Sequence, residues 1–586
     1  MNRTRLIFIA IIGVTFLIIC VAAAAQVINN LAQRLSNGSE TATTPEPTEL
    51  PAGTILVTFA NSNTKQNWID QVIANFNSEN HTTSAGNRII VEVTHGTSGD
   101  SMNAILDGSN RPIAWSPGDR SWVEQLNDTW QIQTNRNLTS QACRPTVYAP
   151  VGFAIWKPMA ETLGWPEPIS WEAIVDLAED PNGWASLGRP EWGQFRFGHT
   201  HPAYANSGLL TMTTFVYGIA GSDQPLTPAM VYDPAVEEAM RTLEQHTSKY
   251  GRQAPALLDL MARQGPSYLH AAAVPEAEVL RFNDERAGEL AFPLVFAFPA
   301  GGTIWAEHPY CVLDNGDWVS DEQAEAANLF GDYLLADAQQ ELAIDNYLRP
   351  IDTTIALRAP VDMAHGTDPT ITPAQVPALP SPDAQVSAAV IDLFQQTKRK
   401  ATVIIVLDTS GSMQTDNRIG TATQATAEFL NRLDPSDEVA VITFSSDVVT
   451  LAEPSRVSEV SEGLSGRITG LIADGSTALY AAVCQAVQLA TDLQNEDRDN
   501  GESRLYGIIL LSDGEDTMGE PSENQMFATC LPTNAEADGI KIFPIALGGE
   551  ADTNVLTRIA NVTGGRLFTA TPASIGNVYI SISAEQ

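Results

Sequence analysis

The sequence predicts an α/β protein made of at least two separately folded parts. Short, unbroken apolar runs alternate with helical patterns in the last third of the chain, as in parallel sheets that are buried on both faces. The tryptophans divide the chain sharply, because all 11 lie between Trp68 and Trp318 and the C-terminal part has none. A length of 586 residues also exceeds that of one ordinary domain.

The N-terminus has the pattern of an export signal. Two arginines precede an uncharged apolar run, Leu6–Ala25, which at about 20 residues is long enough to span a bilayer. We expect residues 1–25 to be an uncleaved signal anchor of a single-pass cell-membrane protein, with everything after Gln26 outside the cytoplasm. Small residues before Gln26 leave cleavage and secretion as the alternative. Residues 26–52, rich in Ser, Thr, Pro and Glu, predict a disordered stalk.

Residues 53–358 open with a strand, a helix and a second strand, at Ile55–Phe59, Trp68–Phe76 and Ile89–Val93. The loops that follow the strands are polar and rich in glycine. Backbone amides and hydroxyls at helix starts make good sites for polar or anionic ligands. Alternatively, these side chains only cap helices, as Ser and Asn often do. The candidate ligand-binding residues are Asn61, Ser62, Thr97, Ser98, Trp115, Ser116, Asn206 and Ser207.

Three stretches of this segment carry a diffuse family pattern: residues 148–156, residues 197–208, and Gly301-Gly302-Thr303-Ile304-Trp305. With them the segment resembles an extracellular solute-binding protein of the periplasmic type. The resemblance implies two α/β lobes joined by strand crossovers, with an unidentified small solute bound in the cleft between them. Many relatives place a carboxylate before the Gly-Thr pair, and this chain has Gly301 there, so the type of ligand does not transfer.

A connector is expected at residues 359–398. Its first half is rich in proline, and a helical pattern at Val386–Gln396 leads directly into the first strand of the last part. We found no internal repeat.

Residues 399–586 predict a doubly wound α/β layer, in which ligands bind at the carboxyl ends of the strands. The expected strands include Val403–Leu407 and Ile508–Leu511. The run Asp408-Thr409-Ser410-Gly411-Ser412 directly follows the first of them and places a carboxylate and two hydroxyls at alternate positions. Thr477 precedes a helix, and Asp513 follows the second strand. Hard oxygens of this kind suit a divalent cation such as Mg²⁺.

The order of these residues resembles the metal-ion-dependent adhesion site of a von Willebrand factor type A domain. The match covers Asp408, Ser410, Ser412, Thr477 and Asp513, and departs at Ser476, where many relatives carry glycine. It implies that Mg²⁺ (or Mn²⁺ or Ca²⁺) binds there and leaves a position open for an Asp or Glu of a protein partner. The alternative is a metal-free relative whose polar loops only cap the sheet.

The formal net charge of −38 argues against nucleic acid as a partner, because such binding depends on neutralising phosphates. An anionic membrane surface is also a poor partner for so acidic a chain, and membrane contact is expected only through the N-terminal anchor. The sequence contains no phosphate-binding loop, no Gly-x-Ser-x-Gly elbow and no His-Glu-x-x-His motif. We therefore expect no enzymatic activity.

Cysteine usage fits an oxidising compartment. Apart from Cys20 there are two cysteines in each part, which suggests one disulfide per part, Cys143–Cys311 and Cys484–Cys530. Four buried free thiols are the alternative.

Two functions fit these observations. One is a receptor that captures a small solute and either passes it to a transporter permease or reports it through the C-terminal part. The other is a cell-surface adhesion or scaffold protein whose solute-binding fold serves protein interaction.

Overall fold

The computed structural model describes residue 51 and residues 53–251, 253–502, 504–531, 539–549, 551–572 and 574–583. Residues 1–54 form one unit and residues 55–586 another. The predicted anchor and nearly all of the predicted stalk lie outside the described residues. Among the described helices, none is long and apolar enough to cross a bilayer.

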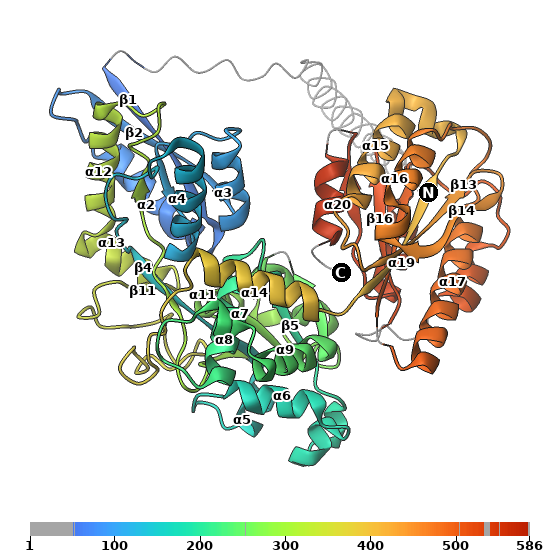
Figure 1. Cartoon of the computed structure of the whole chain (residues 1–586), viewed down its shortest axis with the longest axis horizontal. Coiled ribbons are helices and arrows are strands. Elements are labelled where there is room, and N and C mark those ends of the chain that lie inside the picture. The colour runs from blue at the N-terminus through green and yellow to red at the C-terminus, as the bar shows by residue number, and fades with distance from the viewer. Residues whose placement is uncertain are drawn as a thin grey trace, which may run out of the picture. The chain divides into compact units, whose positions relative to one another are not determined.

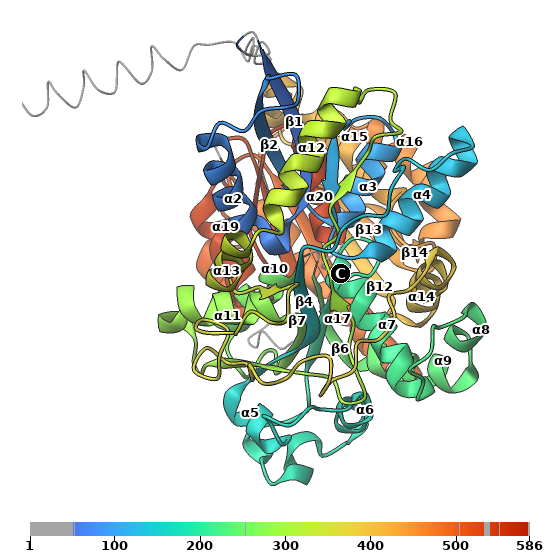
Figure 2. The same ribbon diagram turned by 90° about the vertical axis from the view of Figure 1, so that its left-hand side faces the viewer.

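The first lobe is built on a four-stranded sheet of order β10-β3-β1-β2. Two of its strands, β1 and β2, are labelled in Figures 1 and 2. β1 and β3 run parallel, with Phe59 opposite Ala114, whereas β10 returns antiparallel to β3. Trp68 and Phe76 bury one face of α2 in the core of this lobe. The elements are β1 (Thr54–Ser62), η1 (Asn63–Lys65), α2 (Gln66–Ser78), β2 (Arg88–Gly96), α3 (Ser98–Leu106), β3 (Ala114–Ser116), α4 (Arg120–Thr134), β10 (Cys311–Val312), α12 (Asp321–Leu334) and α13 (Asp337–Asp345).

The second lobe contains a seven-stranded sheet with β11-β4-β7-β5-β6 as its main path and with β8 and β9 also paired to β4. Its strands are β4 (Val147–Trp156), β5 (Phe197–Thr200), β6 (Thr247–Gly251), β7 (Ala271–Pro275), β8 (Leu294–Ala297), β9 (Trp305–Ala306) and β11 (Arg349–Pro350). Its helical segments are α5 (Lys157–Thr162), α6 (Trp171–Glu179), η2 (Gly183–Leu187), η3 (Pro190–Trp192), α7 (Asn206–Ala220), α8 (Pro228–Val231), α9 (Pro234–His246), α10 (Ala254–Gln264), α11 (Glu276–Glu285) and η4 (Ala287–Glu289).

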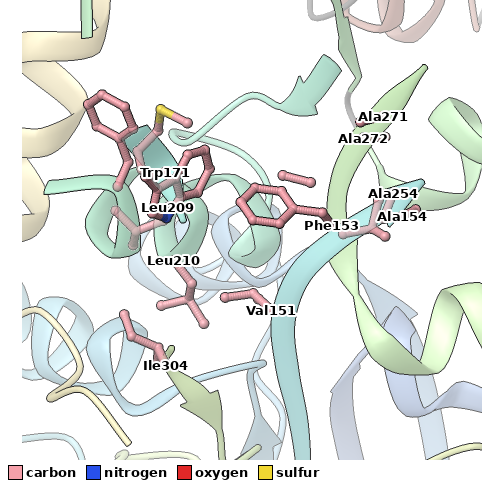
Figure 3. Close-up of a cluster of buried hydrophobic side chains, with 14 of the residues drawn as sticks. Val151, Phe153, Ala154, Trp171, Leu209, Leu210, Ala254, Ala271, Ala272 and Ile304 are labelled. Atoms are coloured by element: carbon pink, nitrogen blue, oxygen red, sulfur yellow. The ribbon is translucent and has the colours of Figure 1, made fainter. Parts of the chain in front are cut away.

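The core of the second lobe joins β4 to the helices that cover it (Figure 3). Phe153 of β4 meets Trp171 of α6 edge to face, with ring centroids 4.7 Å apart. Leu209 and Leu210 of α7 are completely buried in the same cluster. The start of α7 is therefore fixed by packing, and this matters for the cleft described below.

The connector is packed onto the solute-binding lobes. α14 (Ala384–Thr397) begins two residues before the predicted helix, because the side chain of Asp383 accepts a hydrogen bond from Val386 N. α14 contacts α4 of the first lobe and α7, α8 and α9 of the second.

We call residues 376–383, which precede α14, the strap. Ser381 Oγ donates to Asp119 Oδ2 of the first lobe at 2.9 Å. Tyr217 Oη of the second lobe donates to the carbonyl of Pro380 at 3.0 Å. The strap is thus hydrogen-bonded to both lobes.

The C-terminal part is a six-stranded sheet of order β14-β13-β12-β15-β16-β17. Its strands are β12 (Ala401–Asp408), β13 (Glu438–Phe444), β14 (Val448–Arg456), β15 (Leu505–Ser512), β16 (Lys541–Leu547) and β17 (Phe568–Ala570). Its helical segments are η5 (Gly411–Asn417), α15 (Arg418–Leu430), α16 (Val457–Thr469), α17 (Leu479–Asn500), α18 (Glu523–Gln525), η6 (Met526–Cys530), α19 (Thr553–Val562) and α20 (Ile575–Ser583).

Helices cover both faces of this sheet, as the unbroken apolar strands predict. Ile405 of β12 packs in one core with helices α15, α16 and α20, whereas its neighbour Ile404 packs in a second core with α17 and α19. Successive strand residues point to opposite faces, so a strand buried on both sides must be apolar throughout. The doubly wound fold is confirmed.

Both predicted disulfides are confirmed. Cys143 is bonded to Cys311, with Cα atoms 4.5 Å apart, and Cys484 is bonded to Cys530, with Cα atoms 5.0 Å apart. The second bond ties α17 to η6, two segments that follow separate loops of the candidate metal site.

Candidate functional site

Three helices begin around a small chamber between the two lobes. Their first residues, with those of the loops before them, line the chamber at α3, α7 and α10. Neither α7 nor α10 has a side-chain cap, so their first backbone N–H groups are not satisfied in that way. The chamber has a volume of about 40 Å³, which is room for a few atoms only. The chamber therefore offers hydrogen-bond donors to a compact polar group.

The lobes touch each other directly at the rim of this chamber. Trp122 Nε1 of α4 donates to Asn206 Oδ1 at the start of α7, over 2.9 Å. Gly118 lies so close to Asn206 that a Cβ atom at residue 118 would be 2.5 Å from the amide nitrogen of that side chain. A Cβ at Gly99 would lie 3.0 Å from the carbonyl oxygen of Ala203. These contacts describe a closed arrangement of the two lobes, with glycine where their backbones approach.

Five of the candidate ligand-binding residues line the chamber: Ser62, Thr97, Ser98, Asn206 and Ser207. Several also make hydrogen bonds within the protein, but among these five only Thr97 acts as a helix cap, as the capping alternative expects. Thr97 Oγ1 accepts from Asp100 N and caps α3, and Ser98 Oγ accepts from Gly118 N. Ser207 Oγ lies 2.7 Å from Thr200 Oγ1.

The other three candidates do not line the chamber. Trp115 is completely buried, and its Nε1 donates to Ser101 Oγ at 3.0 Å. Ser116 and Asn61 are each 1% exposed, and they lie opposite each other in the parallel pair of β3 and β1. Large apolar surface on Trp115 explains its place in the core.

A second cavity of about 360 Å³ adjoins the chamber and shares with it Asn63, Thr64, Gln253, Pro255 and Glu278. Burial raises the pKa of Glu278, and the Arg281 guanidinium beside it partly offsets that rise. Lys65, which lines the same cavity, is 1% exposed, and burial holds its pKa well below the usual range. Sequence analysis missed these charged groups because a single Glu, Arg or Lys carries no motif.

The candidate metal residues meet at the carboxyl end of the C-terminal sheet. Ser410 Oγ lies 3.0 Å from Ser412 Oγ, which donates to Asp513 Oδ1 at 2.7 Å. Asp408 ends β12 and Asp513 follows the adjacent strand β15, and neither residue has any exposed surface. Asp408 Oδ1 accepts from Ser410 N, and its Oδ2 accepts from Ser512 Oγ.

The third loop, with Thr477, is held against the other two by backbone and side-chain bonds. Gly411 N donates to the carbonyl of Gly475 at 3.0 Å. Thr477 N donates to Thr517 Oγ1, and Thr517 N returns a bond to the carbonyl of Thr477. Thr477 itself is 5% exposed. The three predicted loops are thus assembled into one structure.

Burial raises the pKa of Asp408 to about 6, and the nearby carboxylate of Asp513 adds to the rise. Two buried carboxylates and two hydroxyls in one small network are a set of hard oxygen donors that fits a divalent cation. Within the described part of the chain, no group of three or more His, Cys, Asp or Glu residues is placed to hold a metal ion. A cation at this site would be held by hydroxyl as well as carboxylate oxygens.

Two residues of this network escaped sequence analysis. Ser512 binds Asp408, and Arg418 Nη1 lies 2.8 Å from Asp513 Oδ2. Ser512 adjoins a predicted ligand, whereas Arg418 has no sequence signal that distinguishes it from any other helix-terminal arginine.

Comparison with known proteins identifies two families along the chain. Residues 57–349, half of the chain, match the family model for a bacterial extracellular solute-binding protein, and residues 402–578 match the von Willebrand factor type A domain. These are binding and adhesion types of domain, and the extracellular family indicates an exported protein.

Curated relatives are similar over limited stretches. Inter-alpha-trypsin inhibitor heavy chain H4 of Bos taurus is 37% identical over 121 residues, which are 20% of this chain and 13% of that protein. A UPF0353 protein of Mycobacterium ulcerans (strain Agy99) is 25% identical over 207 residues, 32% of this chain and 61% of the relative. The chain spans less than two thirds of the length of these relatives.

Among solved structures, a periplasmic thiamin binding protein aligns with 13% identity and a TM-score of 0.42, over 61% of this chain and 99% of that one. A von Willebrand factor type A protein from Catenulispora acidiphila aligns with 19% identity and a TM-score of 0.27, over 32% of this chain and 42% of that one. On the family match over half of its length, the chain belongs to the bacterial extracellular solute-binding protein family and carries a von Willebrand factor type A domain at its C-terminal end.

Proposed function

We propose that the chain is an exported, membrane-tethered receptor without enzymatic activity, which binds a small solute between its lobes and a protein partner through a divalent metal. The observation that carries the proposal is the hydrogen-bonded network of Ser410, Ser412 and Asp513 at the sheet edge. The uncharged run Leu6–Ala25 is the basis for the tether.

The solute is a small polar molecule with a compact group that accepts hydrogen bonds. Helix starts supply donors to the chamber of about 40 Å³, and the adjoining cavity of about 360 Å³ takes the remainder of the molecule. A thermal-shift screen of the full chain against a metabolite panel tests this. Tryptophan fluorescence reports on the solute-binding part alone, since all 11 tryptophans lie between Trp68 and Trp318. A panel that includes small anions and sugars and gives no shift would contradict solute binding.

Asp408, Ser410, Ser412, Thr477 and Asp513 would hold Mg²⁺, or Mn²⁺ or Ca²⁺ in its place. The metal would supply a positive centre with an open position for an Asp or Glu of the partner protein. The chain's own contribution is to hold its oxygens together: the backbone of Ser410 and the hydroxyl of Ser512 orient Asp408, and Ser412 orients Asp513.

Calorimetry with Mn²⁺ on the full chain tests the metal site. Asp408→Ala should abolish binding, and Asp408→Asn should do the same while it keeps an acceptor for Ser410 N and so protects the loop. Asp416→Ala removes an exposed carboxylate from the same loop and serves as the matched control, with wild-type affinity expected. Equal Mn²⁺ affinity in wild type and Asp408→Asn would contradict the assignment.

A surface adhesion or scaffold protein is the second candidate. The direct hydrogen bond between Trp122 and Asn206 favours it, because this bond joins the two lobes through their own side chains. In that case the thermal-shift screen against metabolites gives no change in melting temperature, while the metal and a protein partner still bind. A permease encoded beside the gene would favour the receptor.

A further inference from the structure

Thr477 differs from the other candidate metal residues in how it is held. The side chains of Ser410, Ser412 and Asp513 are hydrogen-bonded to one another. The hydrogen bonds that Thr477 makes with the described part of the chain involve its backbone, through N and the carbonyl oxygen. The position of its hydroxyl therefore depends on where the main chain of this loop is held.

Thr517, in the loop that follows β15, holds the main chain of Thr477 from one side. Thr477 N donates to Thr517 Oγ1 at 2.8 Å, and Thr517 N donates to the carbonyl of Thr477 at 2.9 Å. Two bonds of opposite direction between the same two residues fix their orientation as well as their distance. The residues on either side of Thr477 are bonded instead to the loop after β13, at Ser445 and Ser446. Thr517 is thus the contact that joins Thr477 itself to the loop that carries Asp513.

The residue before Thr517 keeps this loop against the start of α17. Asp516 Oδ1 accepts from Tyr480 N, in the first turn of α17, at 3.1 Å. Its Oδ2 accepts from Met518 N at 3.1 Å and from Gly519 N at 2.6 Å. The N-cap residue of α17 gives no side-chain cap, so Asp516 satisfies one of the first N–H groups of that helix. The loop is therefore fastened to the helix start on which it acts.

We infer that Thr517 is a positioning residue of the proposed metal site: by holding the main chain of Thr477 beside the loop of Asp513, it places the Thr477 hydroxyl where a cation can bind it. The inference rests on the proposed metal site and deepens it. Removal of a group that orients a metal ligand typically lowers metal affinity about tenfold or more. Because Thr517 is uncharged, a replacement at this position changes the placement of Thr477 and leaves the charge of the site unaltered.

The test uses the full chain with Thr517→Val, which removes the acceptor at nearly the same shape, and Thr517→Ser, which keeps it. Mn²⁺ affinity, measured by calorimetry, should fall about tenfold in Thr517→Val and stay close to wild type in Thr517→Ser. Thr557→Val makes the same replacement at an exposed threonine of α19 and is the matched control, with wild-type affinity expected. Thermal melting checks that each variant is folded, and Thr517→Ala takes the place of Thr517→Val if the latter does not fold.

A double-mutant cycle separates positioning from a general loss of stability. If Thr517 acts through Thr477, Thr517→Val should have no further effect on Mn²⁺ affinity in a chain that already carries Thr477→Ala. The inference is overturned, and the metal site left standing, by an equal loss of affinity in both backgrounds or by wild-type affinity in Thr517→Val or in Thr477→Ala. Failure of the wild type to bind Mn²⁺ overturns both.

Discussion

Low pH should lower the free energy of unfolding of the solute-binding part because of one buried histidine. His270 precedes β7 and has no exposed surface. Its Nδ1 accepts from Trp184 Nε1 at 3.0 Å and from Arg196 N at 3.1 Å, so that nitrogen carries no proton in the fold. Burial, with the charge of Arg196, lowers the pKa of His270 to about 3.

The direction of the effect follows from this depressed pKa. In the unfolded chain the pKa of this histidine is about 6.5, so below that pH the unfolded chain binds a proton that the folded protein does not bind. The contribution of neutral His270 to the free energy of unfolding is therefore complete above pH 6.5 and is lost as the pH falls toward 3. Each pH unit in this window costs up to about 1.4 kcal/mol. At pH 5 the free energy of unfolding should be about 2 kcal/mol lower than at pH 7 on account of His270 alone.

Urea unfolding at pH 7 and pH 5, followed by tryptophan fluorescence, measures this change in the solute-binding part. His270→Gln keeps an acceptor for Trp184 but cannot titrate, so its stability should fall by about 2 kcal/mol less between the two pH values. His246→Gln is the control, since His246 is an exposed histidine of the same lobe. An equal loss of stability in wild type and His270→Gln would refute the reasoning.

Two further predictions concern the lobes and the N-terminus. Trp122→Phe removes the donor to Asn206, a bond expected to contribute about 1 kcal/mol, and should shift the closed–open equilibrium about fivefold toward the open form. Electron paramagnetic resonance distances between spin labels on the two lobes would measure it, and an unchanged distance distribution would contradict it. Membrane fractionation with N-terminal sequencing should find the protein in the membrane with residues 1–25 retained. A soluble form that starts at Gln26 would rule out the anchor.

The sequence predicted the C-terminal fold well because its signals are local. A strand buried on both faces has to be apolar throughout, as Val403–Leu407 is, and a loop at its carboxyl end can carry ligands regardless of what the rest of the chain does. Cys484 and Cys530 were paired from the same reasoning, because each follows one of the metal loops. These inferences required only the order of elements.

Contacts between residues that are far apart in the sequence were harder to predict. Arg418 and Asp513 are 95 residues apart, and neither sequence environment indicates that they pair. Trp115 lies in a polar stretch of sequence and was predicted to line the cleft. In the structure β3 pairs with β1 and β10, and the side chain of Trp115 is buried in the core. Burial is a property of the assembled lobe, and a pattern of single residues does not encode it.

The position of the strap favours the receptor over the scaffold. Ser381 binds Asp119 of the first lobe, and Pro380 accepts from Tyr217 of the second, only a few residues before α14. α14 ends at Thr397, and the chain then enters β12, whose last residue is Asp408. Opening of the lobes must therefore either break the bond to Asp119 or move the strap with one lobe. This coupling fits the proposed receptor, in which the strap and α14 would carry a change between the lobes toward the C-terminal part.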